Sequence, residues 1–101
     1  MSRQLPRPAK QIDLHAEAFL DNPQDYNSDE LLGETIVFFR EMLDGAIYWD
    51  YNEIRFVHGK GKGLLRQLLY EELREYKFNG TIANYHPSYN NPDVVVVVIG
   101  L

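Results

Sequence analysis

Three alternating glycines join an apolar segment to a helical one near the middle of the chain, in the stretch FVHGKGKGLLR at residues 56–66. The residues up to His58 have strand character, and the segment from Leu64 to Lys77 carries apolar residues at helical spacing. Glycine has no Cβ and tolerates positive φ, so the backbone of such a loop can approach a ligand closely. The stretch therefore predicts a strand, a glycine loop and a helix in immediate succession.

This loop has the features of an anion site. Its amides lie at the expected N-terminus of a helix, where unpaired N–H groups and the helix dipole favour negative charge. The pattern is neither a Walker loop nor a good dinucleotide fingerprint. A structural turn is the alternative interpretation of the glycines alone. The candidate phosphate-binding residues are His58, Gly59, Lys60, Gly61, Lys62, Gly63 and Arg66.

A second candidate element lies upstream, at Gln11 to His15. Ile12 and Leu14 indicate the inner face of a short strand, so Asp13 and His15 share the other face. His15 is the candidate acid–base group because imidazole titrates near neutral pH. Asp13 can orient that ring or bind a cation. A capping carboxylate beside a structural histidine is the alternative interpretation of this pair.

The composition limits the classes of protein and of binding site that the chain can represent. The 101 residues correspond to one domain, and the absence of cysteine excludes disulfides and thiolate zinc sites. A net charge of −5 argues against broad, non-specific duplex binding, but residues 55–66 contain four basic side chains and no acid. The longest apolar run, at residues 94–99, is too short to span a bilayer. We therefore expect no membrane insertion and a cytoplasmic location.

The periodicity predicts an α/β domain of the order β-α-β-α-β-β. One helix is expected from Asn27 or Ser28 to a connection at 48–52, and the other from Leu64 to Lys77. Strands are expected at 11–15, 53–58, 81–85 and 94–99. These elements predict a two-layer sandwich in which two helices cover a mixed four-stranded sheet. The first three strands should run parallel and the last two antiparallel.

The predicted topology brings the two candidate elements together. The carboxyl ends of the first two strands should meet at one edge of the sheet, where open α/β sheets bind ligands. Residues 1–10, with two prolines and three basic residues, are expected to be a flexible linker or N-terminal extension. Residues 11–101 would then form the folded domain.

The two motifs together resemble those of the Smr (small MutS-related) domain. Asp13-Leu14-His15, a long helix and the HGKGKGLLR stretch match the DLH and HGxGxG motifs of that family, and the resemblance covers roughly residues 11–101. The chain is similar to the Smr domain at the C-terminus of MutS2 and of bacterial proteins that carry a domain of unknown function. The resemblance implies a DNA-nicking or RNA-cleaving endonuclease of DNA-repair type, as the C-terminal part of a larger protein.

The resemblance also implies residue roles. Asp13 and His15 would be catalytic, and the loop from His58 to Gly63 would hold the nucleic-acid backbone. No metal ligand is assigned, and a need for Mg²⁺ or Mn²⁺ is left open.

The sequence departs from the family pattern at two places. Ala16 replaces the usual glycine after DLH, and residues 88–93 lack the usual late glycines. These departures favour the alternative of a non-catalytic module that binds nucleic acid or a protein. Homo-association through the apolar strand at 94–99 is a third interpretation.

Overall fold

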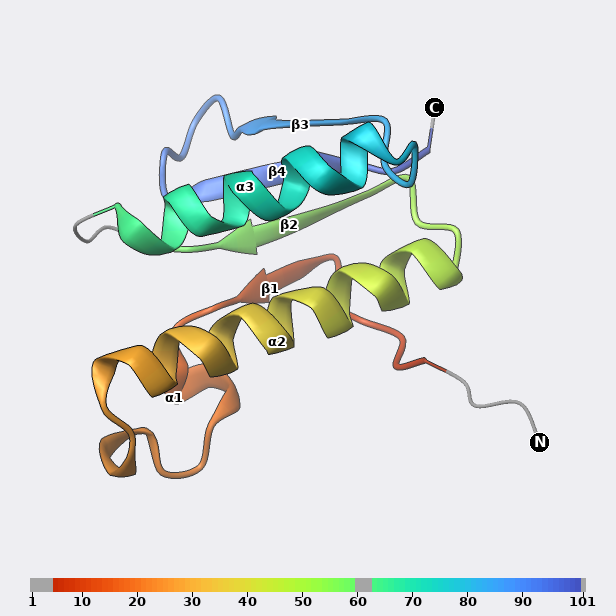
Figure 1. The fold of residues 1–101 in the computed structure, drawn as a ribbon. Helices are drawn as coiled ribbons and strands as arrows, with labels where there is room; N and C mark the ends of the chain where they lie inside the picture. Colours follow the sequence, from red (N-terminus) through yellow and green to blue (C-terminus); the bar gives the residue numbers. More distant parts are fainter. Residues whose placement is uncertain (1–4, 60–62, 101) are drawn as a thin grey trace.

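The computed structural model describes residues 5–59 and 63–100 (Figure 1). The elements in chain order are β1 (Gln11–Asp13), α1 (Ala16–Phe19), the 3-10 turn η1 (Pro23–Asp25), α2 (Ser28–Tyr48), β2 (Glu53–Val57), α3 (Leu64–Phe78), β3 (Asn84–Pro87) and β4 (Val94–Val98). The predicted α/β domain is confirmed, with α2 and α3 as its long helices and a mixed four-stranded sheet.

The sheet has the strand order β1-β2-β4-β3. β1 pairs parallel with β2, and β4 pairs antiparallel with both β2 and β3. The first three strands therefore run in the same direction, as predicted, but β4 lies between β2 and β3. This inner position explains the continuous valine run of β4, since Val94 to Val97 are all buried.

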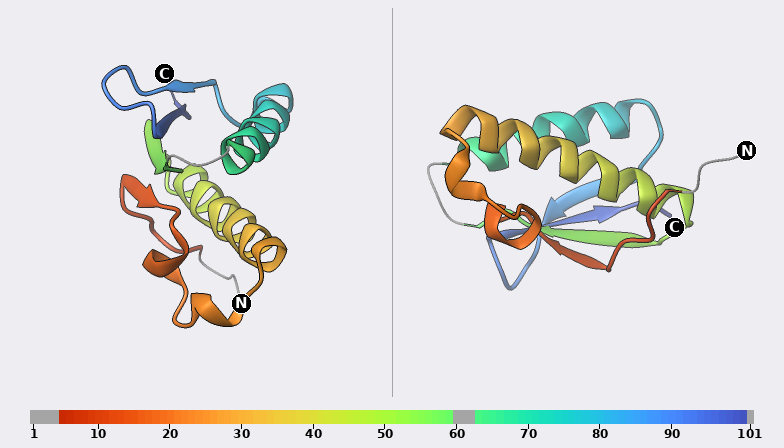
Figure 2. Two further views of the ribbon diagram at one scale, coloured as in Figure 1. Left: turned by 90° about the vertical axis from the view of Figure 1, so that its left-hand side faces the viewer. Right: turned by 90° about the horizontal axis from the view of Figure 1, so that it is seen from below.

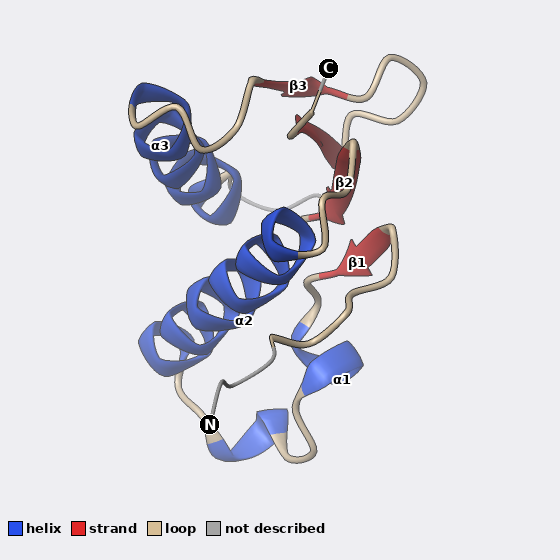
Figure 3. Cartoon of the chain, turned by 90° about the vertical axis from the view of Figure 1, so that its right-hand side faces the viewer, coloured by secondary structure: helices blue, strands red, loops and turns tan. Residues whose placement is uncertain are grey.

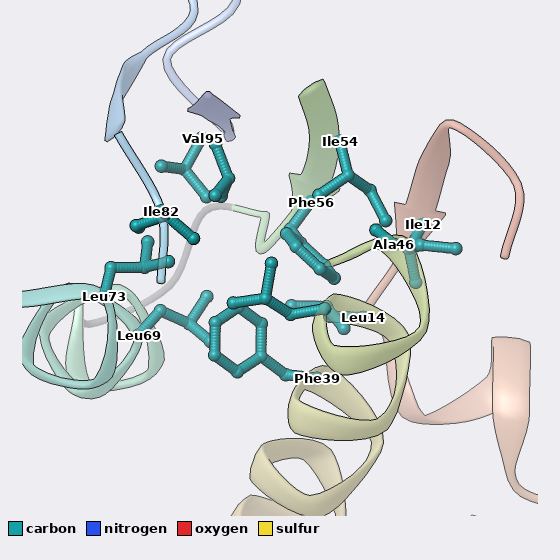
Figure 4. Close-up of a cluster of buried hydrophobic side chains, with 12 residues drawn as sticks. Ile12, Leu14, Phe39, Ala46, Ile54, Phe56, Leu69, Leu73, Ile82 and Val95 are labelled. Carbon is teal, nitrogen blue, oxygen red and sulfur yellow. The ribbon is translucent and has the colours of Figure 1, made fainter. Parts of the chain in front are cut away.

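Both long helices cover the same face of the sheet (Figure 2). Figure 4 shows the core between the layers, where Phe39 of α2 and Leu69 of α3 meet Phe56 of β2. The rings of Phe39 and Phe56 contact edge to face, with centroids 4.7 Å apart. Burying a side chain of this size stabilises a fold by about 1.5–3 kcal/mol. The core thus fixes β2, from which the glycine loop emerges.

The two long helices begin and end as their sequences predict. Asn27 caps α2 in a capping box, since its side chain accepts from the Glu30 amide at 2.8 Å and the Glu30 side chain accepts from the Asn27 amide at 2.9 Å. At the end of α3, Gly80 is the left-handed residue, with φ of 77°. Asn79, the other candidate, is right-handed.

Each predicted strand differs in its bounds, β2 and β4 by one residue and β1 and β3 by more. β1 ends at Asp13 because the Asp13 carboxylate accepts from the His15 amide at 2.9 Å and turns the chain into α1, which the sequence did not predict (Figure 3). β3 begins at Asn84 rather than at residue 81. The Thr81 and Ile82 amides donate to the Tyr76 carbonyl at 2.9 and 3.4 Å, so these residues complete the end of α3.

Residues 5–10 lie against the C-terminal end of α2. The Trp49 indole donates to the Leu5 carbonyl at 3.1 Å, and the Tyr51 hydroxyl donates to the Pro8 carbonyl. A domain boundary at residue 10 stays a prediction. No helix within residues 5–59 and 63–100 has the length and apolar content needed to cross a membrane.

Candidate active site

The first candidate motif lies beside the end of β2. Asp13 is the register partner of Val57, and the Leu14 amide donates to the Val57 carbonyl at 3.0 Å. Parallel pairing therefore places His15 next to Gly59, although the whole of α2 separates them in the sequence. The predicted convergence of the two motifs at one edge of the sheet is confirmed for these residues.

The Asp13 carboxylate orients the His15 ring. The His15 amide donates to Asp13 Oδ1 at 2.9 Å, and His15 Nδ1 lies 2.6 Å from the same oxygen. A carboxylate accepts only, so Nδ1 carries the proton and Nε2 of the neutral ring is left as an acceptor. The backbone bond from His15, followed by the bond from its ring, lowers the pKa of Asp13. Asp13 is therefore ionised near neutral pH and selects this tautomer.

The other ring nitrogen of His15 faces Gly59. A Cβ placed on Gly59 would lie 2.5 Å from His15 Nε2 and 3.0 Å from Cε1, closer than side chains approach one another. Gly59 also has φ of 76°, in the region that glycine adopts readily. The first glycine of the loop is thus required both for its conformation and for the space it leaves to the imidazole.

The Gly59 amide forms a hydrogen bond within the protein backbone. The amides of His58 and Gly59 both donate to the Asp93 carbonyl, at 2.9 and 3.2 Å. Asp93 precedes β4 and belongs to the segment in which the sequence showed no glycines. Residue types carry no signal for this contact, because every residue has the same backbone carbonyl. Gly59 therefore contributes space to the site, while its N–H holds the loop to β4.

His58 is a buried neighbour of the site. Its side chain is 8% exposed, and its Nδ1 lies 3.0 Å from the Gly59 carbonyl. Its Nε2 is buried and has no hydrogen-bond partner in the described part of the chain. These contacts suit a residue that shapes the end of β2. A contact between its ring and a phosphate stays a prediction.

The far end of the glycine loop begins α3. Gly63 is the N-cap, with φ of 80°, and a Cβ there would meet no atom within 4 Å. Arg66 follows in the first turn of the helix and is exposed. Its guanidinium carbon lies 5.1 Å from the centroid of the Tyr70 ring. The other predicted loop residues, Lys60, Gly61 and Lys62, lie outside the described residues.

A groove extends from Gly63 along α3 towards β3, with a volume of about 510 Å³. Its lining includes Arg66, Tyr70 and Arg74 of α3 and Tyr85 of β3. Tyr70, Arg74 and Tyr85 are not among the site residues predicted from the sequence. The spacing of four residues between Arg66, Tyr70 and Arg74 was a signal for a shared helix face, but the contribution of Tyr85 depends on the tertiary fold.

The described residues contain no cluster of metal-ligating side chains. Within 5–59 and 63–100, no three His, Asp or Glu side chains gather as metal ligands would. Asp13 Oδ1 is already engaged by two bonds from His15. A need for Mg²⁺ or Mn²⁺ stays a prediction.

Comparison with known proteins identifies the fold. No protein-family model matches the sequence, and no curated protein matches it. A similar solved structure is the Smr domain of Thermus thermophilus MutS2, with a TM-score of 0.67 and 24% identity over 92% of this chain and 100% of that one. The resemblance predicted from the DLH and HGxGxG motifs is confirmed for the architecture, and this chain has the fold of an Smr domain.

Proposed function

We propose that the chain is a nucleic-acid-binding domain with endonuclease activity and that His15 transfers the proton. The observation that carries the proposal is the contact of one imidazole with Asp13 on one side and Gly59 on the other. The side chains of His15 and Asp13 are 52% and 54% exposed, so a substrate can reach them. The likeness to the MutS2 domain supports nucleic acid as the ligand class.

Phosphodiester cleavage requires a base for the nucleophile, an acid for the leaving oxygen and positive charge near the phosphate. In the proposed reaction, His15 Nε2 accepts the proton of the attacking oxygen, which is water or the ribose 2′-hydroxyl. That oxygen forms the new P–O bond while the P–O bond to the leaving oxygen breaks. The leaving oxygen takes a proton from the imidazolium or from solvent, and Asp13 stabilises the imidazolium in between.

The phosphate would be held from the side of α3. Arg66 supplies one exposed charge, and Lys60 and Lys62 are the sequence-based candidates for two more. Gly61 and Gly63 would allow the backbone to approach the phosphate.

The test is a cleavage assay on labelled single-stranded RNA, single-stranded DNA and nicked or branched duplex, with and without Mg²⁺ or Mn²⁺. We expect His15→Ala to lower the rate by about 10²–10⁴-fold, the usual contribution of a positioned acid or base. The matched control is His86→Ala, because His86 lies on β3 at the other edge of the sheet. Cleavage that survives His15→Ala would overturn the proposed role.

A non-catalytic binding module is the second candidate function. Ala16 favours it, since this residue begins α1 directly after His15, at the position where the family motif has glycine. In this case the same substrates would shift in a binding assay without being cut. A bacterial cytoplasmic location, a DNA-repair role, a larger parent protein and homo-association stay predictions.

A further inference from the structure

We propose that the groove between α3 and β3 binds a single-stranded nucleic-acid segment that extends from the site at His15. We call it the α3–β3 groove and define it by Arg66, Tyr70, Arg74 and Tyr85, with Lys77 beyond its far end. This inference rests on the proposed function, because it names the form of nucleic acid that the same site would accept.

Cations and aromatic rings alternate along the α3–β3 groove. The Arg66 guanidinium lies 5.1 Å from the Tyr70 centroid, and the Tyr70 and Tyr85 rings meet edge to face at 5.6 Å. Lys77 Nζ lies 5.9 Å from the Tyr85 centroid and donates to Asn84 Oδ1 at 3.1 Å. Proteins that bind single strands combine these same elements, because cations follow the phosphates while bases stack on aromatic side chains.

The groove continues the candidate active site. Gly63, the last residue of the glycine loop, belongs to its lining, and α3 leads away from that point (Figure 1). Arg66 and Lys77 are separated by about 16 Å along the helix, given a rise of 1.5 Å per residue. A strand cleaved at His15 would thus meet charge and aromatic surface over that distance.

The charge balance favours a single strand over a duplex. Arg66 and Arg74 form no salt bridge with any described residue, so both are available to phosphates. The lining also contains Glu71, which opposes binding of an anion. Duplex binding rests on many phosphate contacts, and the net charge of −5 gives little support for it. A duplex also keeps its base faces stacked, out of reach of the tyrosines.

The test measures binding of labelled strands of about 12 nucleotides, as RNA, as DNA and as a duplex of the same sequence, by fluorescence anisotropy. Arg74→Glu and Tyr85→Leu should each weaken single-strand binding by about tenfold, and Arg74→Glu should lower the salt dependence. Glu71→Gln should strengthen binding. The matched control is Lys10→Glu, with the same charge change at an exposed residue that precedes β1 and lies outside the groove lining; it should change affinity by less than about twofold.

The outcomes separate this inference from the proposed function. Single-strand binding by the wild type that Arg74→Glu and Tyr85→Leu leave unchanged would overturn the groove and retain the function. Equal weakening of duplex binding would overturn the single-strand assignment. A wild type that binds no nucleic acid would overturn both. Arg74 is exposed, so Arg74→Glu decides the matter even if Tyr85→Leu impairs folding.

Discussion

A Cβ added to Gly59 would lie 2.5 Å from Nε2 of His15. The DLH motif and the glycine loop therefore position the same imidazole ring together. Asp13 holds the ring from one side, and the bare backbone of Gly59 leaves room for it on the other. The position of the proposed base depends on both motifs.

Gly59→Ala should displace the His15 ring and abolish most cleavage. The matched control is Gly80→Ala, because Gly80, at the end of α3, has a similar φ of 77° but no atom within 4 Å of its Cβ position. Both variants should lose about 1–2 kcal/mol of unfolding free energy from backbone strain, measured by urea denaturation. At temperatures where both are folded, Gly80→Ala should retain cleavage. Equal activity of the two variants would contradict the contact between His15 and Gly59.

The Asp13–His15 pair should make the free energy of unfolding depend on pH in the acid range. Bonds from His15 lower the folded-state pKa of Asp13 below its ordinary value of 3.8. A lowered pKa adds stability that is present above 3.8 and is lost as pH falls through the folded-state pKa. Asp13→Asn should remove this part of the acid sensitivity, and the effect should be small because Asp13 is 54% exposed. Urea denaturation in a pH series checks it, and identical slopes for both proteins would contradict it.

Two tyrosines of α3 should respond in opposite ways to loss of the hydroxyl. The Tyr70 hydroxyl is buried with no hydrogen-bond partner among the residues that the structure describes, so Tyr70→Phe should stabilise the fold by up to about 1 kcal/mol. The Tyr76 hydroxyl donates to Asp44 Oδ1 at 2.7 Å, so Tyr76→Phe should cost about 1 kcal/mol. Thermal and urea denaturation measure both. Destabilisation by Tyr70→Phe would show that its hydroxyl is bonded.

The local sequence pattern was enough to predict the two long helices and the helix cap, because these features depend on the residues within each element. Periodicity located α2 and α3, and the cap at Asn27 follows from its side chain. The order of the strands was not predictable in this way, because the insertion of β4 between β2 and β3 depends on packing of whole elements. The start of β3 was wrong because the amide bonds of Thr81 and Ile82 to Tyr76 favour a helix end over a strand.

The candidate site shows the same difference between residues that local sequence reveals and contacts that only the fold creates. Residue types predicted Asp13, His15 and the glycine loop, since their chemistry is visible in the sequence. The Asp93 carbonyl that holds Gly59 was missed because a backbone atom is the same in every residue. Tyr85 was missed because only the fold brings its ring next to that of Tyr70, with the ring centroids 5.6 Å apart.

The most direct test of the central claim is chemical rescue of His15→Ala with imidazole. The variant removes the ring that lies between Asp13 and Gly59 and leaves a space that free imidazole can enter. We measure the initial cleavage rate of the variant with increasing imidazole, and of Asp13→Asn/His15→Ala as the control. Proton transfer by His15 predicts that the single variant regains activity with imidazole and the double variant regains less. No rescue, with wild-type cleavage intact, would contradict the account.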